Sequence, residues 1–429
     1  ALRDVVRHCI YGVDKNPLAV ELCKTALWME TLEPGKPLSF LDAHIRCGDS
    51  LVGVFSPDVL HRGIPDEAYQ ALSGDEKGVC AALKKRNKTA RQGVLEGNLF
   101  GETPVDPTAG ARRGLDDLPE ESLDDVHAKE RAWRSACHAD AAAALPYDLF
   151  VAAFFAPKKA QGGENIPETQ DLVRIRQGQE PRPGPRALAQ RLAREHAFFH
   201  WPLAFPEVFR QGGFDVVLGN PPWERIKIQE QEFFASRHGD IAGAKNQAER
   251  HRLIAALNAP GALPGERALA RAFEEAKRAA EATSLFARAG GRFPLTGVGD
   301  VNTYALFAET CLALLNPKGR GGIIVPTGIA TDDGTKAFFD HLVRQRRLAS
   351  LQDFENREGL FPAVNSRQKF CLLSLASGVE RPTFVFFATA ASHLADERRR
   401  LTLTSADLER INPNTRTCPL FRTREDAEL

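Results

Sequence analysis

The sequence lacks the features that mark secreted and membrane proteins. A membrane-spanning helix needs roughly 20 apolar residues, and the longest apolar run, at 147–156, has about half that length. The first residues, ALRDVVRHC, contain no signal-peptide pattern. The eight cysteines are scattered without a close pair, which argues against both a disulfide framework and a cysteine zinc site. These absences predict a soluble, cytoplasmic protein without a bound metal.

The chain also lacks net charge, since Lys plus Arg and Asp plus Glu both number 56. Any nucleic-acid binding must therefore come from a local basic face. Six arginines between Arg174 and Arg194 form one basic tract, which we interpret first as a solvated face or linker and second as a phosphate-contacting surface. A hydrophobic share of 43% and a charged share of 26% exclude wholesale disorder.

Methionine is almost absent as well. Met29 is the single methionine, and the sequence begins at Ala1. We therefore expect this sequence to be a piece of a longer polypeptide. Cys23, Cys311 and Cys371 have apolar neighbours in the sequence and are expected to be small core residues.

The first 50 residues alternate between strand and helix patterns. A β-favouring run at 9–13 ends at Asp14, and Asn16 and Pro17 then supply the cap and first turn of a helix. A second strand pattern at 44–47 stops at a turn that contains Asp49. This alternation predicts an α/β protein with a doubly wound parallel sheet.

Changes in pattern divide the rest of the chain. The expected parts are residues 1–55 on the cofactor side of a sheet domain, a mostly helical insertion at 56–205, the catalytic part of the same domain at 206–380, and a link toward a target-recognition region at 381–429. A further helical insertion is expected at 224–300. Residues 161–185 are rich in Gln, Gly, Pro and Arg and predict a flexible or loosely packed stretch. Residues 369–375 predict a strand at an antiparallel edge.

One tetrapeptide carries chemistry: Asn220-Pro221-Pro222-Trp223, directly after the apolar strand pattern at 213–219. Two consecutive prolines donate no backbone N–H and keep the chain stiff and extended. The Asn220 side-chain oxygen and the Pro221 carbonyl can then both accept hydrogen bonds from one planar amine. Trp223 offers a flat face on which a base could stack, a contact worth about 1–3 kcal/mol. The end of a strand is also where an open α/β sheet binds its ligand.

With these residues the sequence resembles the adenine-N6 DNA methyltransferases of restriction–modification type, which use S-adenosylmethionine. The resemblance covers residues 1 to about 380 and rests on six elements that occur in family order. It is closest to the large single-chain methylases of combined restriction–modification enzymes and of phage-defence systems such as BREX and DISARM. The elements are Tyr11-Gly12-Val13-Asp14, Ile45-Arg46-Cys47-Gly48-Asp49-Ser50, His200-Trp201-Pro202-Leu203-Ala204-Phe205-Pro206, Phe214 to Trp223, Gly322-Ile323-Ile324-Val325-Pro326-Thr327 and Gly359-Leu360-Phe361-Pro362.

The resemblance implies a Rossmann-like methyltransferase fold and a role for each matching residue. Asp14 would bind the ribose hydroxyls of S-adenosylmethionine, and Asp49 would contact its adenine amine. Asn220, Pro221 and Pro222 would form the amine clamp, while Trp223 and Phe361 would stack on the target base. The implied partner is double-stranded DNA with a flipped-out adenine, with other defence-system subunits as further partners.

The sequence departs from the family pattern in one respect. The Gly-rich cofactor loop of the family follows a central first strand, and residues 1–9 are too few to contain both. We expect that strand and loop to lie upstream in the natural polypeptide. Two alternatives stay open: an amino-methyltransferase that acts on RNA or on a protein glutamine, and a non-catalytic DNA-binding or scaffolding subunit that keeps only the fold.

Overall fold

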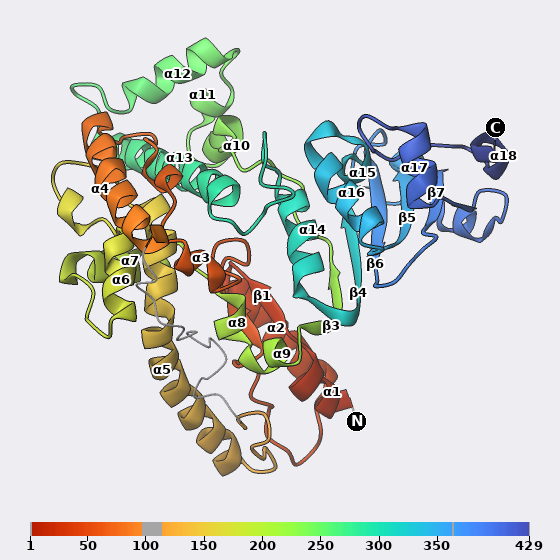
Figure 1. Ribbon diagram of the computed structural model, residues 1–429, viewed down its shortest axis with the longest axis horizontal. Coiled ribbons are helices and arrows are strands. Elements are labelled where there is room, and N and C mark those ends of the chain that lie inside the picture. Colours follow the sequence, from red (N-terminus) through yellow and green to blue (C-terminus); the bar gives the residue numbers. More distant parts are fainter. Residues whose placement is uncertain (1, 97–113, 363, 429) are drawn as a thin grey trace. The chain divides into compact units, whose positions relative to one another are not determined.

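A computed structural model describes residues 2–96, 114–362 and 364–428 of the chain (Figure 1). The chain forms two compact units: Ala1–Glu207 with Ile226–Arg292, and Val208–Arg225 with Phe293–Leu429. Most of the helical insertion expected at 224–300 therefore packs with the first unit. Residues 97–113 of the insertion expected at 56–205 lie outside the described residues. No helix in the described part of the chain has both the length and the apolarity to cross a membrane.

The first unit contains the small parallel sheet that the sequence predicts. Strands β1 (Gly12–Asp14) and β2 (Ile45–Cys47) pair in parallel, with Asp14 opposite Cys47. Helix α2 (Pro17–Glu30) follows β1, and the Asn16 side chain caps it by accepting a hydrogen bond from the backbone N–H of Leu18 at 3.0 Å. The strand–helix–strand pattern at the start of the chain is therefore confirmed.

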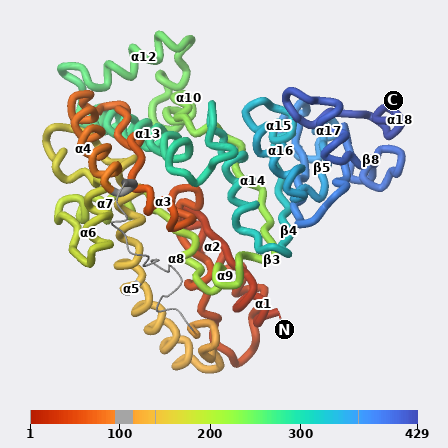
Figure 2. Tube along the Cα trace, in the orientation of Figure 1, coloured from red at the N-terminus to blue at the C-terminus, as the bar shows by residue number. Residues whose placement is uncertain are grey.

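Helices and the turns between them make up the rest of the described part of the first unit. The 33-residue helix α5 (Leu123–Phe155), whose trace is labelled in Figure 2, continues through Pro146. Its C-terminal residues from Leu145 on belong to the main hydrophobic core of the unit. The apolar run at 147–156 is thus a core helix segment. The other helices are α1 (Leu2–Cys9), α3 (Asp58–His61), η1 (Asp66–Tyr69), α4 (Lys77–Glu96), η2 (Gly163–Asn165), α6 (Thr169–Arg176), α7 (Pro183–Glu195), α8 (Trp201–Ala204), α10 (Glu230–Ala235), α11 (Gly239–Ala242), α12 (Gln247–Ala256) and α13 (Pro264–Ala289), while α9 (Pro206–Arg210) contains the boundary between the units.

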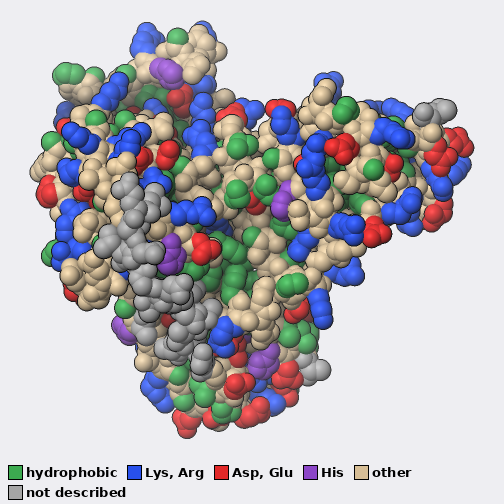
Figure 3. Space-filling model, viewed as in Figure 1, with side chains coloured by type: hydrophobic (Ala, Val, Ile, Leu, Met, Phe, Trp, Pro, Cys, Tyr) green, Lys and Arg blue, Asp and Glu red, His purple; other side chains and the backbone are tan. Residues whose placement is uncertain are grey.

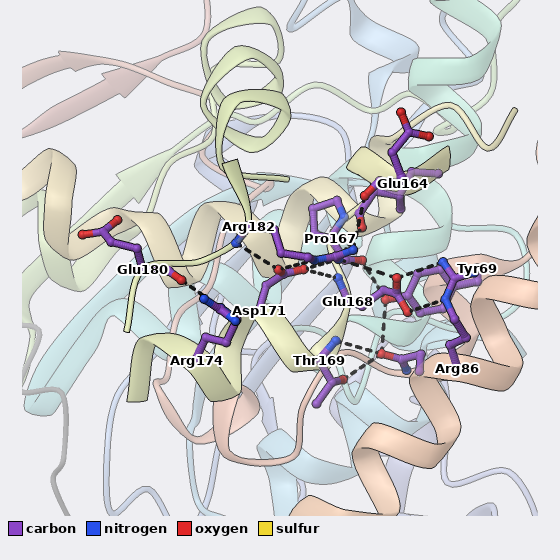
Figure 4. Close-up of polar contacts among 12 residues, drawn as sticks. Tyr69, Arg86, Glu164, Pro167, Glu168, Thr169, Asp171, Arg174, Glu180 and Arg182 are labelled. Carbon is purple, nitrogen blue, oxygen red and sulfur yellow. Dashed lines mark hydrogen bonds and ion pairs between the residues drawn. The ribbon is translucent and has the colours of Figure 1, made fainter. Parts of the chain in front are cut away.

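The prediction of a loosely packed stretch at 161–185 is wrong. This segment forms η2, α6 and the start of α7, and partly exposed arginines that pair with buried carboxylates hold it together (Figure 4). Arg182 donates to both carboxylate oxygens of the fully buried Asp171, at 2.8 and 2.6 Å. Arg86 makes the same bidentate contact with the two carboxylate oxygens of Glu168, at 3.2 and 3.0 Å. The composition of the segment is typical of a loop. The ion pairs that order it form only when the chain folds, so composition alone could not predict them.

A buried asparagine completes this network. The Asn87 amide donates to the Ile64 carbonyl at 2.8 Å, and its oxygen accepts from the backbone N–H of Thr169 at 3.0 Å and from the Tyr69 hydroxyl at 3.2 Å. Tyr69 also donates to the Pro167 carbonyl at 2.9 Å. Buried polar groups of this kind are stable only when they are paired, so the network fixes one arrangement of α4, α6 and η1.

Buried Lys158 gives a pH-dependent prediction. Its Nζ donates to the Ala156 carbonyl at 3.1 Å, and burial lowers its pKa from 10.5 to about 8, while Asp75 opposes and Arg278 adds to that shift. Because the unfolded chain binds more protons between pH 8 and 10.5, this group destabilises the fold below pH 8 and ceases to do so as the pH rises. The difference of 2.5 pKa units corresponds to about 3 kcal/mol. We expect Lys158→Met to stabilise the protein by up to about 3 kcal/mol at pH 7.

Paired urea denaturation of the wild type and the Lys158→Met variant between pH 7 and 10 measures this effect. The advantage of the variant should shrink steadily above pH 8. An advantage that stays constant with pH would show that the ammonium group carries no such cost.

The second unit is built on a six-stranded sheet in the order β3-β4-β6-β5-β7-β8. Strands β3 and β4 are parallel, β6 is antiparallel to both β4 and β5, and β5 and β7 are parallel. The mixed α/β class and the large helical insertions are therefore confirmed. The elements are β3 (Phe214–Gly219), α14 (Thr303–Leu314), β4 (Leu315–Val325), α15 (Gly328–Thr331), η3 (Asp333–Thr335), α16 (Lys336–Arg344), β5 (Leu348–Glu355), η4 (Asn356–Glu358), β6 (Lys369–Leu375), β7 (Thr383–Ala388), η5 (Ala391–Ala395), β8 (Leu401–Thr402), α17 (Ser405–Ile411) and α18 (Arg424–Glu428).

Two sequence expectations need correction here. Strand β6 is antiparallel as predicted, but it lies between β4 and β5 and not at an edge. Cys311 and Cys371 are buried as expected, whereas Cys23 is exposed on α2.

Residues 381–429, expected as a link, also supply β7, β8 and core residues of the second unit.

Candidate functional site

The carboxyl ends of β1 and β2 bring Asp14 and Asp49 to one edge of the small sheet. Asp14 is the last residue of β1, and its backbone carbonyl accepts from the N–H of Gly48, just after β2, at 2.9 Å. One Asp14 carboxylate oxygen accepts from the Asn16 N–H at 2.7 Å, and among the described residues the other oxygen has no hydrogen-bond partner. An exposed carboxylate at a strand end can accept hydrogen bonds from ligand hydroxyls.

Asp49 is held more tightly than Asp14. Its Oδ2 contacts Lys15 Nζ at 2.8 Å, and its Oδ1 accepts from the Leu51 N–H at 3.1 Å. Its backbone N–H donates to the Ala197 carbonyl at 2.7 Å. The Asp49 side chain is 14% exposed, so its carboxylate is directed by the turn while Lys15, 65% exposed, remains largely in solvent.

The segment after α7 holds the Asp49 turn from the other side. The Trp201 indole N–H donates to the Ser50 carbonyl at 3.0 Å, and the Arg292 guanidinium donates to Ser50 and to Gly53, at 2.6 and 3.1 Å. A side chain at Gly53 would meet the Phe199 carbonyl at 2.0 Å, so only glycine permits this approach. Arg292 has no motif around it and was missed at the sequence level.

His200, part of the same segment, is a buried and fully paired histidine. Its Nδ1 accepts from the Val54 N–H at 3.0 Å, which places the ring proton on Nε2, 3.1 Å from the Asp148 carboxylate. Burial also lowers the pKa of nearby His196 below its ordinary value. The His200-to-Pro206 element of the resemblance therefore has a structural role, to position the turn that follows β2.

In the second unit, the amine-clamp residues follow β3. The strand ends at Gly219, and Asn220 is exposed at its end. Within the second unit, Trp223 turns back toward β4, where its indole N–H donates to the Ile324 carbonyl at 3.2 Å. Pro221 and Pro222 thus connect the end of the edge strand β3 to the end of the neighbouring strand β4.

Phe370 joins Trp223 to Phe361. The Trp223 and Phe370 rings are stacked with centroids 6.3 Å apart, and Phe361 meets Phe370 edge-on at 5.2 Å. Buried Asn356 positions the Phe361 loop, since its amide donates to the Phe361 carbonyl at 3.0 Å and its oxygen accepts from the Phe361 N–H at 2.9 Å. The structure therefore brings the two predicted stacking residues into one aromatic cluster. Phe370 and Asn356 were missed because their role depends on a long-range contact.

An open cleft of about 400 Å³ lies beyond the carboxyl end of β4. The Arg367 side chain has no ion pair within the described part of the chain, whereas Lys369 contacts Glu355 at 3.0 Å. The lining residues are Pro326, Thr327, Gly328, Thr331, Asp332, Arg367, Gln368, Lys369 and Leu420. A cleft at a strand end with a free guanidinium can accept an anionic ligand.

Strand β3 has a free edge. Among the described strands it pairs only with β4, and its Val216 and Leu218 side chains are 59% and 78% exposed. Sheet edges that present apolar side chains and unpaired backbone groups attract a further strand.

Half of the six arginines in the tract at 174–194 form ion pairs with carboxylates. Arg182, Arg186 and Arg191 pair with Asp171, Glu180 and Glu195 respectively. On the face that Figure 3 shows, basic and acidic side chains are interspersed. The tract's interpretation as a solvated face thus gains support.

Acidic residues at the ends of parallel strands, and a proline-pair motif at the end of a sheet strand, define the class: an α/β protein whose polar residues gather at the carboxyl ends of its strands. Residues 8–249, more than half of the chain, match the model of the Eco57I restriction-modification methylase family, and the chain belongs to this family. The matched segment contains Asp14, Asp49 and the amine clamp, and ends before Phe361.

The similar proteins come from restriction–modification systems. A Methanocaldococcus jannaschii protein named as a type II restriction enzyme and methyltransferase, RM.MjaORFECS2P, is 22% identical over 250 residues, which cover 52% of this chain and 18% of that protein. The type IIG restriction endonuclease BpuSI is 19% identical, and the match covers 46% of this chain and 20% of the BpuSI chain, with a TM-score of 0.26. A type I methyltransferase subunit from Streptococcus thermophilus is 8% identical, with coverage of 85% and 98% and a TM-score of 0.27.

Both TM-scores are too low to support the fold, which rests on the elements described above. This chain spans about a fifth of the length of the first two relatives.

Proposed function

We propose that this chain transfers a methyl group from S-adenosylmethionine to the N6 amine of a flipped-out adenine in double-stranded DNA, within a restriction–modification or phage-defence system. The observation that carries the proposal is the Asn-Pro-Pro-Trp motif at the end of β3, with Trp223 and Phe361 in one aromatic cluster. Membership of a restriction-modification methylase family supports the same reaction.

The strand-end carboxylates suit the cofactor. Asp14, with one carboxylate oxygen that has no hydrogen-bond partner among the described residues, would accept from the ribose hydroxyls, and Asp49, fixed by its turn, would accept from the adenine amine. When bound, S-adenosylmethionine supplies an electrophilic methyl group on a sulfonium. We further propose that a parallel strand with a Gly-rich loop, from outside this sequence, pairs along the free edge of β3.

Asn220 and Pro221 would hold the adenine amine through two carbonyl oxygens, which directs the nitrogen lone pair toward the methyl group. Such positioning and polarisation are enough for the reaction, without a covalent intermediate. Stacking on Trp223 and Phe361 would offset the few kcal/mol that base flipping costs. The unpaired Arg367 in the cleft beyond β4 would contact a DNA phosphate.

The test is transfer of labelled methyl from S-adenosylmethionine to unmethylated DNA, with the product nucleoside identified by mass. The longest natural polypeptide that contains this chain should be used, with RNA and bulk protein as parallel acceptors. N6-methyladenine as the only product is the expected result. Label in RNA or protein would replace DNA as the substrate, and failure to bind the cofactor would favour a scaffolding subunit.

A further inference from the structure

Thr303 lies where the amine-clamp segment meets the core of the second unit. It is the first residue of α14, whose next residues, Tyr304, Ala305 and Ala308, are buried in the hydrophobic cluster under β4. A group at this helix end is therefore attached to a rigid element, although Thr303 itself is half-buried.

Polar contacts of its hydroxyl and its backbone N–H connect Thr303 to the two residues that flank Trp223, with the single hydroxyl proton shared between two carbonyls. The Thr303 hydroxyl lies 2.7 Å from the Pro222 carbonyl and 3.0 Å from the Glu224 carbonyl, and it accepts from the Glu224 N–H at 3.0 Å. The Thr303 N–H, one of the unpaired donors at the start of a helix, donates to the Glu224 carbonyl at 2.8 Å. The backbone on both sides of Trp223 is thus tied to α14.

We propose that Thr303 is a positioning residue for the amine clamp. Its hydroxyl is the side-chain group that reaches Pro222, and the stiff proline pair transmits that constraint to the Pro221 carbonyl and to Asn220. Trp223, held between the two anchored residues, is fixed in its orientation by the same contacts. This inference rests on the proposed methyl transfer and adds a residue for which the sequence gives no signal.

The Thr303→Val variant removes the hydroxyl and keeps the shape, while Thr303→Ser keeps the hydroxyl. Pro222 and Glu224 are exposed, so water can replace the lost hydrogen bonds and the fold should survive. The matched control is Thr310→Val in the same helix, because the buried Thr310 hydroxyl has no hydrogen-bond partner within the described residues.

Two measurements test the proposal. For Thr303→Val we expect kcat for methyl transfer to fall at least about tenfold, with the Kd for S-adenosylmethionine unchanged within about twofold, and Thr303→Ser to recover most of the loss. Hydrogen–deuterium exchange of a peptide containing Glu224 should accelerate roughly fivefold in Thr303→Val and stay unchanged in Thr310→Val.

The exchange measurement separates this inference from the proposed function. A wild type that transfers no methyl group would defeat the proposed function, and exchange alone would then decide whether Thr303 holds the segment. Unchanged exchange in Thr303→Val, or an unchanged kcat in an active enzyme, would overturn the positioning role.

Discussion

Replacing Asn220 with alanine is expected to lower methyl transfer to DNA by about 10²–10³-fold and to leave the affinity for S-adenosylmethionine unchanged. The substitution removes one of the two oxygens proposed to hold the target amine, a loss comparable to removing one preorganised polar group that stabilises charge in a transition state. Asn220 is exposed beyond the end of β3, so the fold should tolerate the change. Single-turnover transfer and cofactor titration together measure the effect.

Asp14→Ala is the reciprocal variant. It should weaken cofactor binding about 10- to 100-fold, since hydrogen bonds to a charged group contribute about 1.5–3 kcal/mol each. The matched control for Asn220→Ala is Asn258→Ala, because Asn258 is an exposed asparagine after α12. This control variant should change neither cofactor binding nor methyl transfer. Equal loss of cofactor binding and turnover in Asn220→Ala would contradict the roles assigned to these two residues.

Asp171→Ala is expected to destabilise the first unit by about 3–5 kcal/mol. Asp171 is fully buried and accepts two hydrogen bonds from Arg182. Without the carboxylate, the guanidinium stays partly buried beside a cavity, with only the more distant Glu168, at 3.5 Å, to balance its charge. Urea denaturation followed by hydrogen exchange of peptides from α6 and α7 measures the loss.

Two further variants test whether the unpaired Arg182 charge causes the loss of stability in Asp171→Ala. Glu130→Ala removes an exposed partner of Arg134 on α5 and should cost at most about 1 kcal/mol. The double variant Asp171→Ala with Arg182→Ala should cost less than the sum of the two single changes, because it removes the unpaired charge. A loss below about 1 kcal/mol in Asp171→Ala would mean that the buried pair contributes little to stability.

Local signals account for the elements that the sequence predicted correctly. The Asn16 cap and Pro17 fix the start of α2, and the apolar run before Asn220 fixes β3. Asp14 ends β1 and Asp49 follows β2, and because the two strands are parallel both residues lie at the same end of the small sheet. The functional roles of these residues stay predictions.

Long-range contacts account for what the sequence did not predict. Phe370 became part of the site only because β6 inserts between β4 and β5, an order that no local pattern specifies. Arg292 reaches the Asp49 turn from more than 240 residues away along the chain. The stretch at 161–185 has the composition of a loop, and it is ordered by ion pairs with α4 and within the segment itself.

The free edge of β3 has a consequence for the behaviour of the isolated chain. Natural edge strands are usually protected from self-association by charged residues, proline or a bulge. The β3–β4 pairing is irregular between Phe214 and Val216, and beyond that point β3 presents the exposed aliphatic side chains of Val216 and Leu218. Two molecules that met along this edge would form a continuous intermolecular ladder. Because Asn220 follows β3 directly, any strand that paired along this edge would both steady the residues proposed to hold the target amine and block such self-association.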